Sequence, residues 1–543
     1  MSEPRIKPFK VTWDQFFKGV EDLETAPRSD PLINKIVVYP EIIPIIFVPG
    51  IMGSRLIQTG SGKNVWDPDS ISSMVRNYGF NCPPDKRKNY LVGEASHNDS
   101  HLTVNSISKK VAANKRDHDW AGVAYRYYGD ILEAMGSHQW PFPLNICFKF
   151  PVYAFGYNWT DSNLESGRKL AEYIEAVIAK HTWTTCRRVI LVTHSMGGLV
   201  ARAACKLHGA ESRVLGIVHG TQPATGSPAA YQRMKQGFRD LHRTAWDWLI
   251  SPLESIKNKV GERVLGPSGQ SVTIVMANMP GGLELLPNQL YRTNDGKAQW
   301  LTYNLSNGRR VELPEKDPYR EIYAKQHEAF RLVNPAWLGD GSGKAKGSLD
   351  AQRLIGPWRD YTMSLNKAKT FHNKLGDYVH PESYQFYSTG LNTADTVTIA
   401  SQKYSAQDLA VKHNSQGKTF FEILDEMGNT VDPHELWMEH MPYIYGNTPP
   451  PASSARKTLY AFAIEPPTGS GDGTVPDSSA QTLDARPESY TKGPDGTVDI
   501  NENDESGAKR EHSVIFNSRT AQQITLRAIE NLCKYVFNKQ TAR

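Results

Sequence analysis

The segment Val189–Arg202, VILVTHSMGGLVAR, joins a strand pattern to a helix pattern through one short turn. The β-branched residues before Thr193 predict a buried strand, and the alanine-rich stretch after Gly198 predicts a helix. Ser195 lies on the turn between them. A serine on a sharp strand-to-helix turn presents its hydroxyl above the sheet, beside the amide of the next residue. We therefore predict that Ser195 is a nucleophile; the alternative is an ordinary strand–turn–helix with a solvated serine.

A second turn of the same kind follows an earlier buried strand, in the segment Pro44–Leu56 with the sequence PIIFVPGIMGSRL. A glycine-rich turn at this place can direct a backbone N–H at an oxyanion. One such donor contributes about 2.7–4 kcal/mol of transition-state stabilisation. We predict the amide of Met196 as one donor and the amide of Ile51 as the other, with Met52 as the second choice. Without the serine downstream, this segment would be an ordinary turn.

An acid and a histidine follow the serine in the chain order Ser, Asp, His that this arrangement requires. Asp472 lies in a glycine-rich loop after the apolar run LYAFAI, and His512 precedes the last helix pattern, near 518–537. We predict Asp472 as the acid and His512 as the base. Asp477 and His440 are the competitors, and Asp472 has an alternative role as a turn residue because Asp-Gly is a common turn signal.

The order of patterns along the chain predicts the fold. Strand patterns alternate with helix patterns, and this alternation predicts an α/β fold, with a mostly parallel sheet covered by helices on both faces. We expect a core of residues 35–228 and 455–543, interrupted by a large cap or lid insertion of residues 229–454, in which 384–387 and 396–399 form short strands. Ser162 and Glu165 predict a capping box at the start of one core helix. The core strands are expected near 42–48, 148–155, 187–193, 213–219 and 457–464, and the helices near 119–136, 162–181 and 196–208.

The first part of the insertion is the candidate lid. Trp246, Trp248 and Leu249 lie there among lysines and arginines. Tryptophans flanked by basic residues suit a water–lipid boundary, which predicts peripheral contact with a membrane. A helix pair packed on the core explains the same pattern equally well, so both interpretations stay open.

Three of these segments resemble the lipase branch of the α/β-hydrolases, which includes the lecithin:cholesterol acyltransferase-like and PGAP1-like enzymes. They are THSMGGLVAR at 193–202, VPGIMGSRL at 48–56, and SGDGTVP at 470–476 followed by a histidine. Thr193 replaces the first glycine of the elbow, and Pro49 stands where many lipases have histidine. The resemblance implies an α/β-hydrolase fold and a lipid or phospholipid ester as substrate.

A looser resemblance connects the chain to antibacterial lipase effectors of type VI secretion. It is carried by the large size, by His118–Gly122 ahead of a helix, and by an amino terminus without the apolar stretch of a secretory signal. The resemblance implies immunity and secretion-apparatus proteins as partners. We expect synthesis in the cytoplasm and secretion into the periplasm of a target cell.

The composition argues against several classes of partner and cofactor. The net charge of +5 on 543 residues is too small an excess to argue for a nucleic-acid partner. The five cysteines are scattered without metal-ligand spacing, so we predict no metal and no cofactor. The acidic segment 499–505 lacks the glycine and glutamate of a calcium-binding EF-hand loop.

These observations together predict a serine hydrolase that cleaves acyl esters of lipids, a phospholipase or lipase. An intracellular carboxylesterase or acyltransferase is the alternative, because it would form the same acyl-enzyme. An alternative of another class is a catalytically inactive hydrolase fold that serves in binding.

Overall fold

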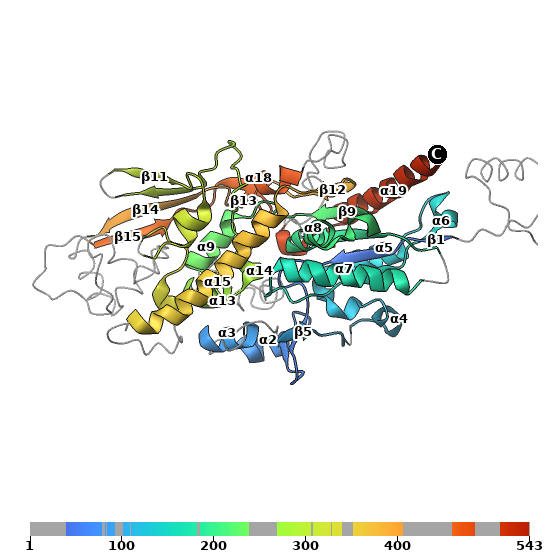
Figure 1. Ribbon diagram of the computed structural model, residues 1–543, viewed down its shortest axis with the longest axis horizontal. Helices are drawn as coiled ribbons and strands as arrows, with labels where there is room; N and C mark the ends of the chain where they lie inside the picture. The colour runs from blue at the N-terminus through green and yellow to red at the C-terminus, as the bar shows by residue number, and fades with distance from the viewer. Residues whose placement is uncertain are drawn as a thin grey trace, which may run out of the picture.

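The centre of the computed structural model is a five-stranded parallel sheet with the strand order β12-β9-β8-β2-β7 (Figure 1). These strands are β2 (Ile45–Val48), β7 (Val152–Ala154), β8 (Val189–His194), β9 (Val214–Gly220) and β12 (Ser383–Phe386). The predicted α/β-hydrolase-type fold is confirmed. The structure describes residues 40–78, 82, 84–92, 101–108, 110–181, 185–237, 269–305, 308–326, 328–338, 351–404, 459–483 and 511–541.

The path of the chain through this sheet decides where a site can form. The chain enters at β2, adds β7 on one side, and then crosses to β8 on the other side of β2 before it continues to β9 and β12. The direction of winding therefore reverses between β2 and β8. Ligands of open α/β sheets bind at the carboxyl ends of the strands at such a reversal. The turns that follow β2 and β8 carry Ile51 and Ser195.

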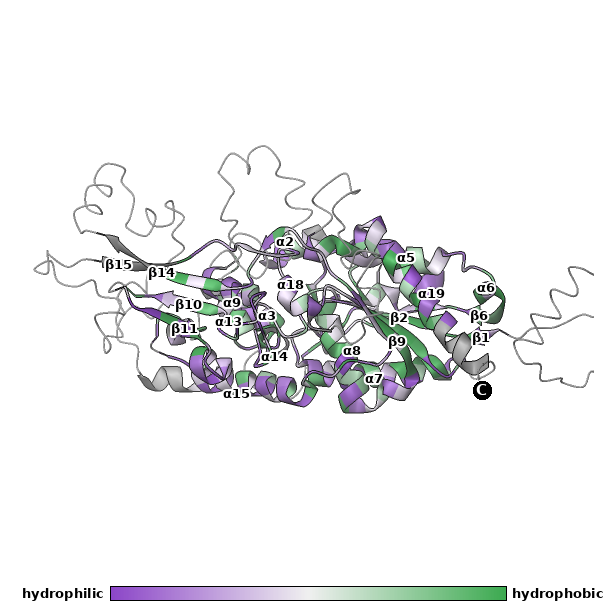
Figure 2. Cartoon of the chain, turned by 90° about the horizontal axis from the view of Figure 1, so that it is seen from above, coloured by the Kyte–Doolittle hydropathy of each residue, from purple (hydrophilic) through white to green (hydrophobic). Residues whose placement is uncertain are grey.

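Alternation along the strands divides the core into two layers, because successive strand residues point to opposite faces of a sheet. Ile46 and Val48 pack with α7 (Asn163–Ala179) and α8 (Met196–His208). Ile45 and Phe47 pack with α5 (Tyr125–Ser137) and α19 (Arg519–Thr541). All four are fully buried, and each contributes about 1.5–3 kcal/mol by leaving water. Figure 2 shows β2 and β9 as hydrophobic strands between helices with polar outer surfaces.

A second sheet of four strands lies beside the central one, in the order β11-β10-β14-β15 (Figure 1). The long helix α15 lies beside the second sheet, and its end reaches α8 of the central layer (Figure 1). The strands are β10 (Leu301–Asn304), β11 (Arg310–Leu313), β14 (Val397–Tyr404) and β15 (Leu459–Ile464), and the neighbouring helices are α9 (Pro228–Gln236), α13 (Gly269–Met276), α14 (Pro280–Leu283) and α15 (Ala351–Leu375).

Two predicted strands lie in a different sheet from the one expected. The 457–464 strand, expected in the core, is β15 and pairs antiparallel with β14 in the second sheet. The 384–387 strand, expected in the insertion, is β12 and forms the edge of the central sheet beside β9. Both strands form where they are predicted, but the sheet expected for each is wrong. An apolar run indicates a buried strand, whereas its partner strand is set by contacts distant in sequence.

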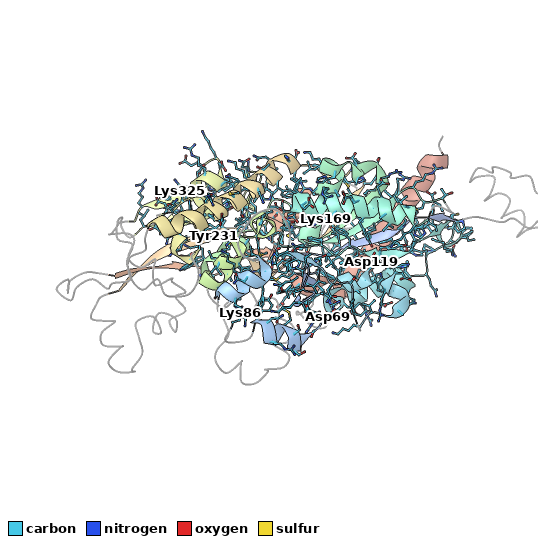
Figure 3. All side chains as sticks on the ribbon, turned by 60° about the horizontal axis from the view of Figure 1, so that its bottom comes forward. Asp69, Lys86, Asp119, Lys169, Tyr231 and Lys325 are labelled. Carbon is cyan, nitrogen blue, oxygen red and sulfur yellow. The ribbon has the colours of Figure 1, made fainter. Side chains whose placement is uncertain are left out.

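Two helix starts near the site are capped by carboxyl groups from other parts of the chain. Asp69, labelled in Figure 3, accepts the amides of Tyr125 and Arg126 at the start of α5, at 2.9 and 2.8 Å. Ser162 caps α7, as predicted. Glu165 does not complete the capping box, because it pairs with an arginine one turn on.

The carboxyl group that completes the cap of α7 comes from Glu284, just after α14. It lies 2.6 Å from Ser162 Oγ and accepts the Asn163 amide at 2.7 Å. Burial raises the pKa of this carboxyl group to about 8. Glu284 thus connects the end of α14 to α7, a helix of the central layer.

The segment after β2 forms a small antiparallel sheet of β3 (Leu56–Gln58), β4 (Asn64–Trp66) and β5 (Leu102–Val104). A buried ion pair, Arg55 to Asp67 with both contacts at 2.9 Å, holds its base. Among the described helices, none is both long and apolar enough to span a membrane. Shorter elements include β1 (Glu41–Ile42), β6 (Phe148–Lys149), α6 (Leu144–Cys147), β16 (Gly469–Gly471) and α18 (Asp477–Ala480).

Candidate active site

Ser195 is held in a strained backbone conformation between β8 and α8. Its φ of 52° and ψ of −125° lie outside the regions that non-glycine residues usually occupy. Tight contacts enforce this conformation. A Cβ on Gly197 would lie 2.4 Å from the Val48 carbonyl oxygen, and a Cβ on Gly50 would lie 2.9 Å from Ser195 Cβ. Glycines at these two positions therefore allow the turns after β2 and β8 to touch.

The three predicted side chains lie in one hydrogen-bonded row. His512 Nε2 is 2.7 Å from Ser195 Oγ, and His512 Nδ1 is 2.6 Å from Asp472 Oδ2. The other oxygen of Asp472 accepts the amides of Thr474 and Val475 at 3.0 and 2.7 Å. The Asp472 carboxylate accepts a hydrogen bond from Nδ1–H, so Nε2 is left without a proton and can accept a hydrogen bond from the serine hydroxyl. This arrangement can remove a proton from Ser195 as it attacks a carbonyl carbon.

The two predicted oxyanion donors flank the contact between the turns. Met196 is the first residue of α8, and Ile51 lies in the turn that the Gly53 amide closes onto the Gly50 carbonyl at 3.0 Å. Within the described part of the chain, neither the Met196 nor the Ile51 amide has a hydrogen-bond acceptor. Met52, the second choice, has a φ of 61°, and its carbonyl accepts the Trp66 indole N–H at 2.8 Å.

The two departures from the lipase pattern have structural partners. Thr193, in place of the elbow glycine, is buried, and its hydroxyl lies 3.1 Å from Nδ1 of His219 on the neighbouring strand. The Pro49 carbonyl accepts the Tyr157 hydroxyl at 2.9 Å. Both residues are thus accommodated without a contact to the Asp472–His512–Ser195 row.

The competing residues take other positions. Asp477 begins α18, and burial raises the pKa of its carboxyl, with the charge of Asp472 adding to the effect. The partner of His512 is Asp472. Several predicted residues lie outside the described part of the chain: His440, the lid candidates Trp246, Trp248 and Leu249, and the acidic segment 499–505.

Two buried side chains that the sequence patterns did not single out lie behind the row. His194 precedes the serine, and its Nε2 is 2.9 Å from the His512 carbonyl oxygen. Tyr128 of α5 lies 2.9 Å from His194 Nδ1. His194 lies next to the predicted nucleophile in the sequence, but the turn pattern gives it no role of its own. Tyr128 carries no motif that could have revealed it.

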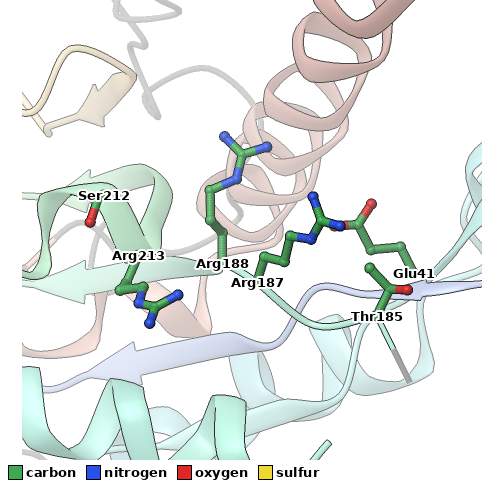
Figure 4. A pocket seen from close by; sticks show the side chains of 6 residues that line it. All are labelled: Glu41, Thr185, Arg187, Arg188, Ser212 and Arg213. Carbon is green, nitrogen blue, oxygen red and sulfur yellow. The ribbon is translucent and has the colours of Figure 1, made fainter. Parts of the chain in front are cut away.

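A hollow of about 490 Å³ lies at the opposite edge of the sheet (Figure 4). Its residues are in β1 or just before β8 and β9, at the amino ends of the strands, whereas Ser195 follows the carboxyl end of β8. The hollow is therefore remote from the row. It is lined by Glu41, Thr185, Arg187, Arg188, Ser212 and Arg213. Among the described residues, no group of three or more histidine, cysteine or acidic side chains is arranged to hold a metal ion.

Comparison with known proteins agrees with this geometry. A family model described as the PGAP1-like alpha/beta domain matches residues 100–283, which include Ser195 but neither Asp472 nor His512. Residues 100–283 of this chain are therefore similar to a PGAP1-like α/β domain. The predicted resemblance to this branch of the α/β-hydrolases is confirmed. No curated protein matches the chain in sequence.

Solved structures extend the likeness beyond the PGAP1-like domain. The protein in "The crystal structure of Tle4-Tli4 complex" aligns with 91% of this chain and 99% of its own, with 23% identity and a TM-score of 0.64. Identity at this level shows a shared fold. Lipase BlEst2 of Bacillus licheniformis in its propeptide form has 16% identity over 46% of this chain and 33% of its own, with a TM-score of 0.17. Phospholipase PlaB of Legionella pneumophila has 12% identity over 52% and 72%, with a TM-score of 0.15. These two low TM-scores lend no support to a shared architecture.

Proposed function

We propose that this protein is a serine hydrolase that cleaves acyl esters of lipids. The observation that carries the proposal is the continuous row from Asp472 through His512 to Ser195. These residues come from three loops distant in sequence, and they meet at the carboxyl ends of the strands where the winding of the sheet reverses.

The geometry supports an acyl-enzyme mechanism. Ser195 Oγ attacks the ester carbonyl carbon while His512 Nε2 takes the hydroxyl proton, and Asp472 stabilises the imidazolium through Nδ1–H. The amides of Met196 and Ile51 stabilise the oxyanion of the tetrahedral intermediate. His512 then gives its proton to the leaving alcohol, and the acyl group stays on Ser195. Water attacks this ester, His512 takes its proton, and the fatty acid leaves as Ser195 regains its hydrogen.

The lipid character of the substrate is supported by the PGAP1-like domain and by the similarity of the elbow, early turn and acid loop to the lipase branch. A phospholipid is the substrate we propose to test first. An acyltransferase would use the same residues, with an alcohol in place of the second water.

We further propose that the protein acts as an antibacterial effector and is neutralised by a partner protein. The support is the alignment with Tle4 over nearly the whole of both chains, because Tle4 was solved in complex with Tli4. The proposed site of action is the periplasm of a target cell, where a phospholipase meets the membrane surface.

The test of the hydrolase proposal combines covalent labelling with product analysis. A fluorophosphonate probe is expected to label the wild type and not Ser195→Ala. Incubation with phosphatidylethanolamine and phosphatidylglycerol vesicles is expected to release free fatty acid, measured by mass spectrometry. Labelling that survives in Ser195→Ala would contradict the assignment of the nucleophile.

The same reaction with an added acceptor alcohol separates the alternatives. Transfer of the acyl group to the alcohol in preference to water would identify an acyltransferase. A wild-type protein that neither takes the probe nor releases product, while it binds vesicles, would identify an inactive hydrolase fold.

A further inference from the structure

His194 and Tyr128 connect all the parts of the proposed active site from behind. The Gly50 amide donates to Tyr128 Oη at 3.2 Å, Tyr128 Oη is 2.9 Å from His194 Nδ1, and His194 Nε2 is 2.9 Å from the His512 carbonyl oxygen. Gly50 begins the turn that holds Ile51. One chain of hydrogen bonds thus extends from the oxyanion turn, past the elbow, to the main chain of the catalytic base.

The donor and the acceptor of each of these hydrogen bonds can be assigned. The His512 carbonyl can only accept, so His194 Nε2 carries the proton and Nδ1 accepts. The Tyr128 hydroxyl must therefore donate to Nδ1, and its lone pair accepts the Gly50 amide. Burial, and secondly the charge of His512, hold the pKa of His194 well below its ordinary value, so the ring stays neutral in this tautomer.

The main chain of His512 is held on both sides. Its amide donates to the Asp472 carbonyl oxygen at 3.1 Å, and its carbonyl accepts from His194. The two imidazole rings lie with centroids 5.0 Å apart, and Phe516 packs edge-on against His194. A neutral His194 also suits the reaction, because a cationic ring there would repel the imidazolium that forms on His512.

We propose that Tyr128 and His194 are positioning residues of the reaction, which fix the oxyanion turn and the base relative to Ser195. The inference rests on the proposed hydrolase function. Neither residue touches substrate, and both act through Gly50 and His512. Their loss should lower kcat, because a base displaced by about 1 Å costs on the order of 10²-fold.

Two substitutions of His194 remove its two hydrogen bonds one at a time. His194→Asn places an oxygen near the former Nδ1, which keeps an acceptor for Tyr128 but loses the bond to His512. His194→Gln places an amide N–H near the former Nε2, which keeps a donor for the His512 carbonyl. We expect His194→Asn to lower kcat by about 10²-fold with KM nearly unchanged, and His194→Gln to restore most of that loss.

The chain contains a matched control away from the site. His372 of α15 has the same surroundings: its Nδ1 is hydrogen-bonded to Tyr319, and its Nε2 is 2.9 Å from the Glu284 carbonyl oxygen. It is also buried, and burial lowers its pKa to about 4. His372→Asn and Tyr319→Phe should lower the Tm as His194→Asn and Tyr128→Phe do, and should leave kcat per folded molecule unchanged.

The experiment measures kcat, KM and Tm for the wild type and these variants with a short soluble ester. Proton NMR would follow the strongly deshielded Nδ1–H of His512, which should broaden or vanish in His194→Asn alone. Equal kcat in His194→Asn, His372→Asn and the wild type would overturn the inference. So would a kcat in His194→Gln as low as that in His194→Asn. A wild type without esterase activity would instead overturn the proposed function, whatever the variants do.

If His194→Asn does not fold, Tyr128→Phe decides the question. It removes one hydroxyl and should reduce kcat through the Gly50 turn while KM holds. A Tyr128→Phe protein with wild-type kcat would overturn the inference.

Discussion

The backbone of Ser195 stores strain that its surroundings must balance. A conformation with φ of 52° at a non-glycine residue costs about 1–3 kcal/mol and persists only when neighbours enforce it. The enforcing contacts are those of Gly50 and Gly197 with the end of β2 and with the serine itself. The elbow is therefore a joint property of two turns, and a change in either should displace the nucleophile.

Gly197→Ala tests this dependence. The new Cβ would lie 2.4 Å from the Val48 carbonyl oxygen and 2.5 Å from that of Pro49, so the start of α8 must move. We expect the free energy of unfolding to fall by about 1–3 kcal/mol, as for other overpacked sites. Esterase activity should fall by about 10²-fold, because the serine moves with the helix. Urea denaturation and ester kinetics would measure the two effects.

Gly356→Ala is the matched control for this substitution. Gly356 lies inside α15, directly before Pro357, and no atom outside its chain neighbours and the helix backbone lies within 4 Å of the position that its Cβ would take. Because a proline disfavours the helical conformation of a non-glycine residue before it, alanine should lower the free energy of unfolding slightly. Activity should stay as it is in wild type, because the position is away from Ser195. A Gly197→Ala protein as stable and active as wild type would contradict the enforced elbow.

Residues differ in how well the sequence alone reveals them. Ser195 lies in a local strand–turn–helix pattern, so its position and backbone strain could be predicted from a dozen neighbours. His512 and Asp472 needed only their chain order and loop context. Tyr128 and His194 could not be found this way, because their roles depend on contacts with Gly50 and His512 that exist only in the folded chain.

The elements of the core also differ in how well the sequence predicts them. The helix after Ser195 begins and ends where its pattern indicates, and Gly209, with a φ of 73°, terminates it. β12 and β15 could not be assigned to their sheets, because an apolar run fits either one. The sequence predicted one part of the cap of α7. Ser162 could be predicted because it lies at the start of the helix, whereas Glu284 could not, because it lies more than a hundred residues away in sequence.

The cap of α7 by Glu284 makes stability depend on pH. The pKa of this carboxyl is about 8 in the folded protein and 4.5 in its ordinary state. Between these values the folded state binds a proton that the unfolded state does not, so stability falls as pH rises. Glu284→Gln, which keeps an acceptor oxygen for the Asn163 amide, should lose this slope and be more stable than wild type above pH 8. The measurement is Tm against pH for both proteins.

Glu165→Gln gives the comparison for Glu284→Gln. Glu165 lies one turn into the same helix, is partly exposed, and pairs with Arg168. Its substitution should leave the slope of Tm against pH between 5 and 8 as in wild type. An unchanged slope in Glu284→Gln would mean that Glu284 is ionised in the folded protein and that the cap is a charged one.

The two largest sheets of the described residues are joined through α15 and through the chain that follows it. The end of α15 reaches α8, and carbonyls at this end and just after it accept from α8 side chains: Lys206 donates to Leu375, the last residue of α15, and Arg202 donates to Gly376 and Tyr378. The central sheet in turn takes its edge strand, β12, from the chain that follows α15. The second sheet is thus joined to the central layer at several points. The likeness to Tle4 likewise covers nearly the whole length of both chains.

The proposed effector function predicts where the whole protein is harmful. Phospholipid hydrolysis by Ser195 should damage a cell when the protein reaches the outer surface of the cytoplasmic membrane. Expression directed to the periplasm by an added signal should therefore reduce viability in a bacterial host, and expression in the cytoplasm should reduce it much less. Ser195→Ala in the periplasm is the control and should be harmless, with immunoblots showing equal amounts of protein. If Ser195→Ala is still toxic in the periplasm, the toxicity does not depend on catalysis by Ser195. If the wild type is harmless in the periplasm but has esterase activity, an intracellular carboxylesterase or acyltransferase is the better interpretation.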